Sequence, residues 1–115
     1  MKKISTIIVF LAFLSGCSSV SQGGYYWGDY SSTYFSLVKD RNADTVSRRV
    51  VALEDIVSKS ADRDIRVPPG IHAELGMLYA EEGREAEDFA QFEREVALYP
   101  EAKPFIERLI ARKQP

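Results

Sequence analysis

The sequence predicts an all-α fold of about five antiparallel helices. Beyond residue 24, apolar residues recur at intervals of three and four, the spacing that gathers them on one face of a helix. Proline and glycine interrupt these runs at 67–70, 83 and 100, and no stretch alternates apolar and polar residues as a half-buried strand would. Because the segments between successive helices are short, neighbouring helices are expected to run antiparallel.

Two helices are expected before the break at 67–70. The first spans about 29–40, with Asp29 or Ser31 as its N-cap, and the second follows Asn42 and runs for about five turns. The expected inward-facing residues are Tyr30, Tyr34, Leu37 and Val38 in the first helix, and Ala43, Val46, Val50, Leu53 and Val57 in the second. Arg48 and Arg49 fall largely outside this second apolar stripe.

Three further helices are expected at about 71–82, 84–98 and 101–112. Gly83 is placed to end the first of them in a left-handed conformation, and Pro100 stops the second. The expected inward-facing residues are Ile71, Leu75, Leu78 and Tyr79, then Phe89, Phe92, Val96 and Tyr99, and finally Ala102, Phe105, Ile106 and Leu109.

The segment that precedes the helices resembles the precursor of a bacterial lipoprotein. Lys2 and Lys3 are followed by a short apolar run and then by Leu14-Ser15-Gly16-Cys17, which resembles a lipobox. The resemblance implies that residues 1–16 are a signal peptide and that Cys17, the only cysteine, carries lipid. Residue 18 is serine rather than aspartate, which in this class favours the outer membrane, with the domain facing the periplasm.

Residues 17–24 are small and polar and are expected to form a lipidated, flexible tether. At about 3.5 Å per residue, this tether reaches at most ~28 Å. The helical domain, residues 25–115, is therefore expected to lie close to the membrane.

Composition argues against several functions. Without Lys2 and Lys3, 13 of the 15 basic residues remain against 17 acidic ones, with no dense basic run, which argues against nucleic acid as a partner. His72 is the only histidine and is expected to pack or face solvent. With the one cysteine lipidated, we expect no cofactor, no metal site and no catalytic residues, and hence no enzyme. A cluster of acidic residues is expected on a solvated face and consists of Glu81, Glu82, Glu85, Glu87 and Asp88.

Residues 72–100 are similar to a tetratricopeptide repeat, a pair of antiparallel helices. The matching positions are Leu75, Gly76, Tyr79, Gly83, Phe92 and Pro100. The resemblance implies that Gly76 lets the two helices approach closely and that Phe92 fills the gap between them. The chain departs from the pattern at His72, Asp88 and Glu95, where the repeat has a bulky residue and two alanines. Residues 29–61 would be a more divergent repeat, and the last helix a C-terminal cap.

The chain also resembles a family of small proteobacterial outer-membrane lipoproteins of undefined function. The resemblance is carried by the Tyr-Trp-Gly-Asp-Tyr segment at 26–30, the Pro-Pro-Gly turn at 68–70 and the segment at 99–105. Members are often encoded beside a lipoprotein resembling the curli secretion channel. This implies a non-enzymatic accessory role in an envelope assembly, with such a lipoprotein as one protein partner.

An aromatic stretch is the candidate partner-binding site and comprises Tyr25, Tyr26, Trp27 and Tyr30. Exposed Tyr and Trp rings stack on sugars, so peptidoglycan or carbohydrate binding is the alternative function. Such rings also occur in protein interfaces and in the lipid headgroup zone. A purely structural alternative is that Trp27, Tyr30 and Tyr34 seal the end of the helical stack. Tyr25 and Tyr26, next to the tether, are expected to be the more exposed pair.

Overall fold

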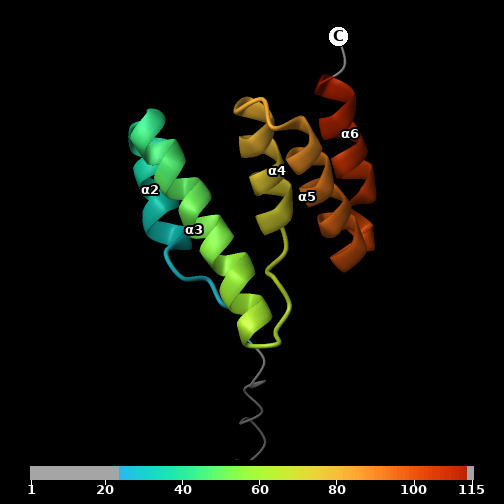
Figure 1. Ribbon diagram of the computed structural model, residues 1–115, viewed down its shortest axis with the longest axis horizontal. Coiled ribbons are helices and arrows are strands. Elements are labelled where there is room, and N and C mark those ends of the chain that lie inside the picture. Colours follow the sequence, from blue (N-terminus) through green and yellow to red (C-terminus); the bar gives the residue numbers. More distant parts are fainter. Residues whose placement is uncertain (1–23, 114–115) are drawn as a thin grey trace, which may run out of the picture.

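The computed structural model describes residues 24–113, and these form an all-helical domain (Figure 1). Its elements are α2 (Tyr30–Lys39), α3 (Ala43–Asp62), α4 (Ile71–Glu81), α5 (Glu85–Leu98), the short 3₁₀ helix η2 (Pro100–Ala102) and α6 (Lys103–Lys113). The predicted all-α class and its five helices are confirmed. Cys17, the signal peptide and all of the tether except Gly24 lie outside the described residues.

The ends of the helices follow local rules. The side chain of Asn42 accepts a hydrogen bond from the backbone of Thr45, and the hydroxyl of Thr45 accepts one from the backbone of Asn42, so the predicted N-cap of α3 is confirmed. Asp29 occupies the N-cap position of α2, but its side chain makes no capping bond. The final helix begins at residue 103 rather than 101, because Pro100 opens a separate 3₁₀ turn.

The closest helix pair is α4 and α5. Phe92 is buried against α4, and a Cβ atom built on Gly76 would lie only 2.5 Å from its ring. Glycine is therefore required at this crossing, because any side chain would displace the phenylalanine. The expected contact between Gly76 and Phe92 is confirmed.

The main core joins α3 to α4 and is made of Val50, Leu53, Ile56, Val67, Ile71, Leu75, Leu78 and Tyr79. The predicted face of α3 was partly wrong. Ala43 is exposed, whereas Ala52 and Ile56 are buried, so the buried face is rotated around the helix from the predicted stripe. The buried face lies in this direction because α3 packs against both α2 and α4.

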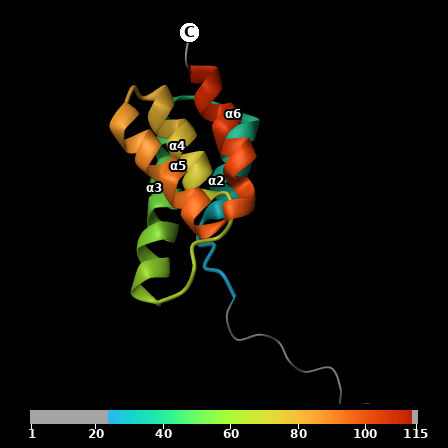
Figure 2. The same ribbon diagram turned by 90° about the vertical axis from the view of Figure 1, so that its right-hand side faces the viewer.

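The last helix packs more lightly than the others. Ile106 is buried against Phe92 and Ala73, but Phe105 is about half exposed, so the prediction that it faces inward was wrong. Phe89 on α5 is also half exposed, so the prediction that it faces inward was wrong as well. In Figure 2, α6 stands in front of α2, so these two helices lie at opposite ends of the row of helices.

Within residues 24–113, no helix is both long enough and apolar enough to cross a membrane.

Candidate functional site

The aromatic stretch forms a continuous ladder of four rings, which we call the aromatic ladder: Tyr25, Trp27, Tyr30 and Tyr34. Tyr25 and Trp27 meet edge to face with ring centroids 6.2 Å apart, and Trp27 meets Tyr30 in the same way at 5.0 Å. Tyr30 and Tyr34 are one helical turn apart and lie nearly parallel, at 6.3 Å. Edge-to-face and offset contacts at these distances are favourable for aromatic rings.

The first two residues of the aromatic stretch, Tyr25 and Tyr26, are held by two different helices. The hydroxyl of Tyr99 donates to the carbonyl of Val67 at 2.7 Å and accepts a hydrogen bond from the Tyr25 hydroxyl at 3.3 Å, which ties the ladder to the end of α5. Tyr26 points the other way and donates to Asp55 of α3 at 2.9 Å, with Arg63 stacked 4.4 Å above its ring. Tyr26 is therefore half-buried, and the prediction that it is one of the exposed pair was wrong.

A sharp turn separates these rings from α2. Gly28 has a φ of 44°, and a Cβ atom there would lie 2.9 Å from the hydroxyl of Tyr26. A left-handed conformation combined with so close a neighbour suits glycine alone. The turn closes with a hydrogen bond from the backbone of Tyr30 to the carbonyl of Trp27.

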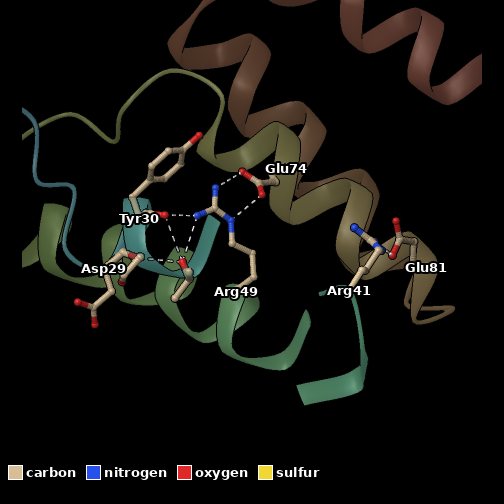
Figure 3. Close-up of polar contacts among 8 residues, drawn as sticks. Asp29, Tyr30, Arg41, Arg49, Glu74 and Glu81 are labelled. Atoms are coloured by element: carbon tan, nitrogen blue, oxygen red, sulfur yellow. Dashed lines mark hydrogen bonds and ion pairs between the residues drawn. The ribbon is translucent and has the colours of Figure 1, made fainter. Parts of the chain in front are cut away.

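A buried arginine lies beneath the ladder. Arg49 of α3 is fully buried and donates two hydrogen bonds to the carboxylate of Glu74 on α4, at 2.7 and 2.8 Å (Figure 3). It also donates to the backbone carbonyl of Tyr30 and to the hydroxyl of Thr33, both on α2. Its guanidinium lies 4.1 Å from the centre of the Tyr30 ring and 5.4 Å from that of Tyr34. One side chain thus joins three helices.

The electrostatics of this junction favour the charged arginine. Burial alone would lower the pKa of Arg49, but the hydrogen bonds and negative charge of Glu74 outweigh it, so the pKa is raised. The bidentate geometry is the strongest form of an arginine–carboxylate pair. The arrangement fixes α2 against α3 and α4, and it holds the ring of Tyr30 in place.

Sequence reasoning missed Arg49, which it placed outside the apolar stripe of α3. A signal was present: Ala52, Leu53 and Ile56 lie three, four and seven residues after Arg49, so all four share one face of the helix. Charge alone argued for exposure, and the partner Glu74 is too distant in sequence to be recognised.

Beyond the inner rings, apolar side chains reach the surface. We call the following set the N-terminal apolar patch: Tyr25, Trp27, Tyr34, Phe35 and Val38. Tyr25 and Trp27 are each about two-fifths exposed, at 41% and 42%, and Phe35 and Val38 are each 68% exposed. The prediction that Tyr34 and Val38 face inward was wrong, because only Leu37 of α2 is buried. Trp27 and Tyr34 therefore do not seal the stack, and only Tyr30 is held in it.

Two acids stand where the tetratricopeptide pattern has alanine, and both are buried. Glu95 of α5 accepts hydrogen bonds from the backbone of Gly70 at 2.7 Å and of Ala73 at 3.3 Å, so it caps the start of α4 from a neighbouring helix. Asp88 is buried and pairs with Lys113 of α6. The prediction that Asp88 lies on a solvated face was therefore wrong. Both departures thus serve to join helices.

His72 is buried at the start of α4, and its Nδ1 lies 2.7 Å from the side-chain oxygen of Gln91. Burial lowers the pKa of this imidazole, although the hydrogen bond to Gln91 and the charge of Glu95 oppose the shift. The neutral form is favoured at pH 7, and the residue acts as a packed, hydrogen-bonded part of the α4–α5 contact.

The described residues also contain open grooves. One lies between α5 and α6, has a volume of about 340 Å³ and is lined mainly by Phe89, Phe92, Val96, Ala97, Ile106 and Ile110. The charged residues among its lining are Glu93, Lys103 and Glu107. In residues 24–113, no group of three or more His, Cys, Asp or Glu side chains is arranged to hold a metal ion.

Comparison with protein families gives one match, over residues 25–109, to the model described as Domain of unknown function (DUF4810). This chain belongs to the DUF4810 family. The matched region begins at the first ring of the aromatic ladder and ends within α6, so the ladder, the Arg49 junction and the groove lie almost wholly inside it. No curated protein and no solved structure matches this DUF4810 chain.

Proposed function

We propose that this DUF4810 chain is a lipoprotein of the bacterial outer membrane whose helical domain faces the periplasm and binds another envelope protein, without catalysing a reaction. The membrane part rests on Leu14-Ser15-Gly16-Cys17, with serine rather than aspartate after the cysteine. In such proteins the cysteine carries diacylglycerol and an amide-linked acyl chain, and several chains anchor far more firmly than one.

The observation that carries the binding function is the groove between α5 and α6. Its lining is mainly apolar and also includes Glu93, Lys103 and Glu107, a combination that suits the apolar face of a partner helix or peptide. Phe89 borders it with about half of its side chain exposed. The tetratricopeptide-like pattern of residues 72–100 supports the same function, since paired helices of that kind present grooves to peptides. A lipoprotein resembling the curli secretion channel is the first candidate partner.

In-cell crosslinking tests this proposal. The tagged protein is crosslinked in intact cells and purified, and its partners are identified by mass spectrometry. We expect one reproducible envelope protein whose yield falls several-fold in Phe89→Ser and is unchanged in Phe105→Ser. The control removes an equally exposed phenylalanine that does not line the groove. Recovery of no reproducible partner, or equal recovery with both variants, contradicts the proposal.

A second candidate function is binding of peptidoglycan or another carbohydrate. It is favoured by the exposed rings of Tyr25 and Trp27, which stand edge to face at the start of the ladder. Sedimentation with purified sacculi tests it, with Tyr25→Ala and Trp27→Ala as variants. Tyr26→Ala serves as the control, because that ring is held by Asp55 and Arg63. Binding that persists in both variants contradicts this function.

A further inference from the structure

Exposed apolar side chains are concentrated at the N-terminal end of the described chain. Nine large apolar residues are exposed in residues 24–113, and five of them form the N-terminal apolar patch. The five fall within residues 25–38, so more than half of these residues come from one short segment. A concentration of exposed apolar side chains of this kind marks a binding site or a membrane contact.

Three residues of the patch lie on one flank of α2, and Tyr25 and Trp27 precede this helix. Tyr34, Phe35 and Val38 lie on this flank, whereas Ser32, Ser36 and Lys39 form the opposite one. The side chains of the patch offer an occupant apolar and aromatic contact, which suits a lipid surface.

The position of the patch along the chain indicates what covers it. Its first residue, Tyr25, directly follows the tether, and Cys17 lies only eight positions before Tyr25. At about 3.5 Å per residue, the span from Cys17 through Gly24 is at most ~28 Å. An anchor of this length keeps the patch continuously within reach of the bilayer surface, so that even a weak contact is formed most of the time.

We infer that the N-terminal apolar patch rests in the headgroup region of the bilayer, with zwitterionic lipid as its occupant; this inference depends on the anchor in the proposed function. Trp and Tyr favour this zone because their rings are apolar and their N–H and O–H groups remain hydrated. Phe35 and Val38 insert beside them. Neither side chain can hydrogen-bond to a sugar, and so the patch as a whole suits lipid better than glycan.

This contact orients the domain. The α5–α6 groove lies at the other end of the row of helices from α2 (Figure 1). With α2 against the lipid, the groove stays free for a protein partner, so the two surfaces do not compete.

Trp27 is the only tryptophan of the chain, which makes its fluorescence a direct probe of the patch. The protein as processed by the cell is reconstituted into phosphatidylcholine vesicles that carry nitroxide labels at the headgroup or at a shallow acyl position. We expect a blue-shifted Trp27 emission that the labelled lipids quench and that dissolved acrylamide quenches poorly. Because the patch is uncharged, added salt should leave this quenching unchanged.

Variants separate the patch from the anchor. In Phe35→Ser/Val38→Ser, lipid quenching of Trp27 should be largely lost, whereas Val51→Ser/Phe105→Ser, which changes two other residues that are more than half exposed, should match the parent. Circular dichroism checks that both variants keep their helices. The mass of each protein reports acylation at Cys17, so a missing anchor is distinguished from a patch that does not touch lipid.

Three results would overturn the inference. The first is an acylated parent protein whose Trp27 is quenched by acrylamide and not by labelled lipid. The second is equal lipid quenching in both double variants. The third is sedimentation with sacculi that requires Trp27 but neither Phe35 nor Val38, which would make the occupant a glycan.

Discussion

Two helices of this protein, α2 and α5, are held against their neighbours in different ways. In the α4–α5 hairpin, Phe92 is buried against Gly76, and the contact between the helices is close and apolar. The α2–α3 hairpin meets α4 through the main apolar core on α3 and through the ionic pair of Arg49 and Glu74, but α2 itself buries only Leu37 of its ten residues. Helices α3 to α5 therefore supply most of the apolar core, and α2 keeps its aromatic side chains available at the surface.

The difference has a physical cause. A helix at the end of a row has a neighbour on one side only, so α2 cannot bury a wide apolar face. Polar bonds from Arg49 to the Tyr30 carbonyl and to Thr33 fix its position instead. These polar bonds orient α2 without covering its apolar side chains, so those side chains stay exposed.

The largest expected effect comes from the apolar contact. Phe92→Ala should lower the free energy of unfolding by about 3–5 kcal/mol, the usual cost of removing a buried phenylalanine. Gly76→Ala should also destabilise the fold through its clash with the Phe92 ring, despite alanine's better helix propensity. Phe89→Ala, at an exposed position of the same helix, should stay within about 0.5 kcal/mol. Urea unfolding measures all three, and equal losses for Phe92→Ala and Phe89→Ala would contradict the comparison.

Removing the ionic pair of Arg49 and Glu74 should lower the free energy of unfolding by a smaller amount. Arg49→Met should destabilise by about 3 kcal/mol, at the low end for a broken buried pair, because Glu74 is 26% exposed and stays partly hydrated. Arg48→Met is the matched control, since Arg48 pairs with Asp44 at the surface, and it should change stability by less than about 0.5 kcal/mol. Hydrogen exchange should show faster opening of α2 than of α5 in Arg49→Met. Uniform opening of both helices would show that the junction supports the whole domain.

Removing the cap that Glu95 of α5 provides at the start of α4 should lower the stability by less still. Glu95→Ala should cost about 1–2 kcal/mol, because it leaves the buried backbone N–H groups of Gly70 and Ala73 without an acceptor. Glu93→Ala changes an exposed glutamate on the same helix and serves as the control. Thermal unfolding of both variants checks this, and an unchanged midpoint for Glu95→Ala would mean that α4 needs no cap from α5.

The smallest expected effect is a dependence on pH. Because burial lowers the pKa of His72 in the folded state, the unfolded chain binds the proton more readily. Stability should therefore fall as the pH drops below about 6.5, by at most ~1.4 kcal/mol per pH unit. His72→Gln should reduce this slope between pH 7 and 5.5, where carboxylates contribute less. An identical slope in the variant would show that His72 does not cause it.

The order and bounds of the helices were predictable because local signals set them. Asn42 and the proline and glycine residues at 67–70, 83 and 100 mark boundaries that need no knowledge of tertiary contacts. The contact of Gly76 with Phe92 was also predictable, since a repeat-like spacing implied it.

Burial could not be predicted for charged residues whose partners are distant in the sequence. Arg49, Asp88 and Glu95 are charged and were expected outside the core or left in doubt, yet each is buried with a partner 25 residues away. Of the candidate site, the predicted exposure of Tyr25 is confirmed, and the binding of a partner by Tyr25 and Trp27 stays a prediction. Phe35 and Val38 were missed, because helical spacing alone does not reveal that α2 has a neighbour on one side only.

The proposed contact of the N-terminal apolar patch with lipid requires that Cys17 holds the chain at a membrane. The intact mass of the protein extracted from cells tests this most directly. We expect a chain that begins at Cys17 and carries the mass of attached acyl groups. Cys17→Ser should accumulate as an unmodified precursor. A chain with an unmodified Cys17, or a Cys17→Ser protein that still carries acyl groups, would contradict it.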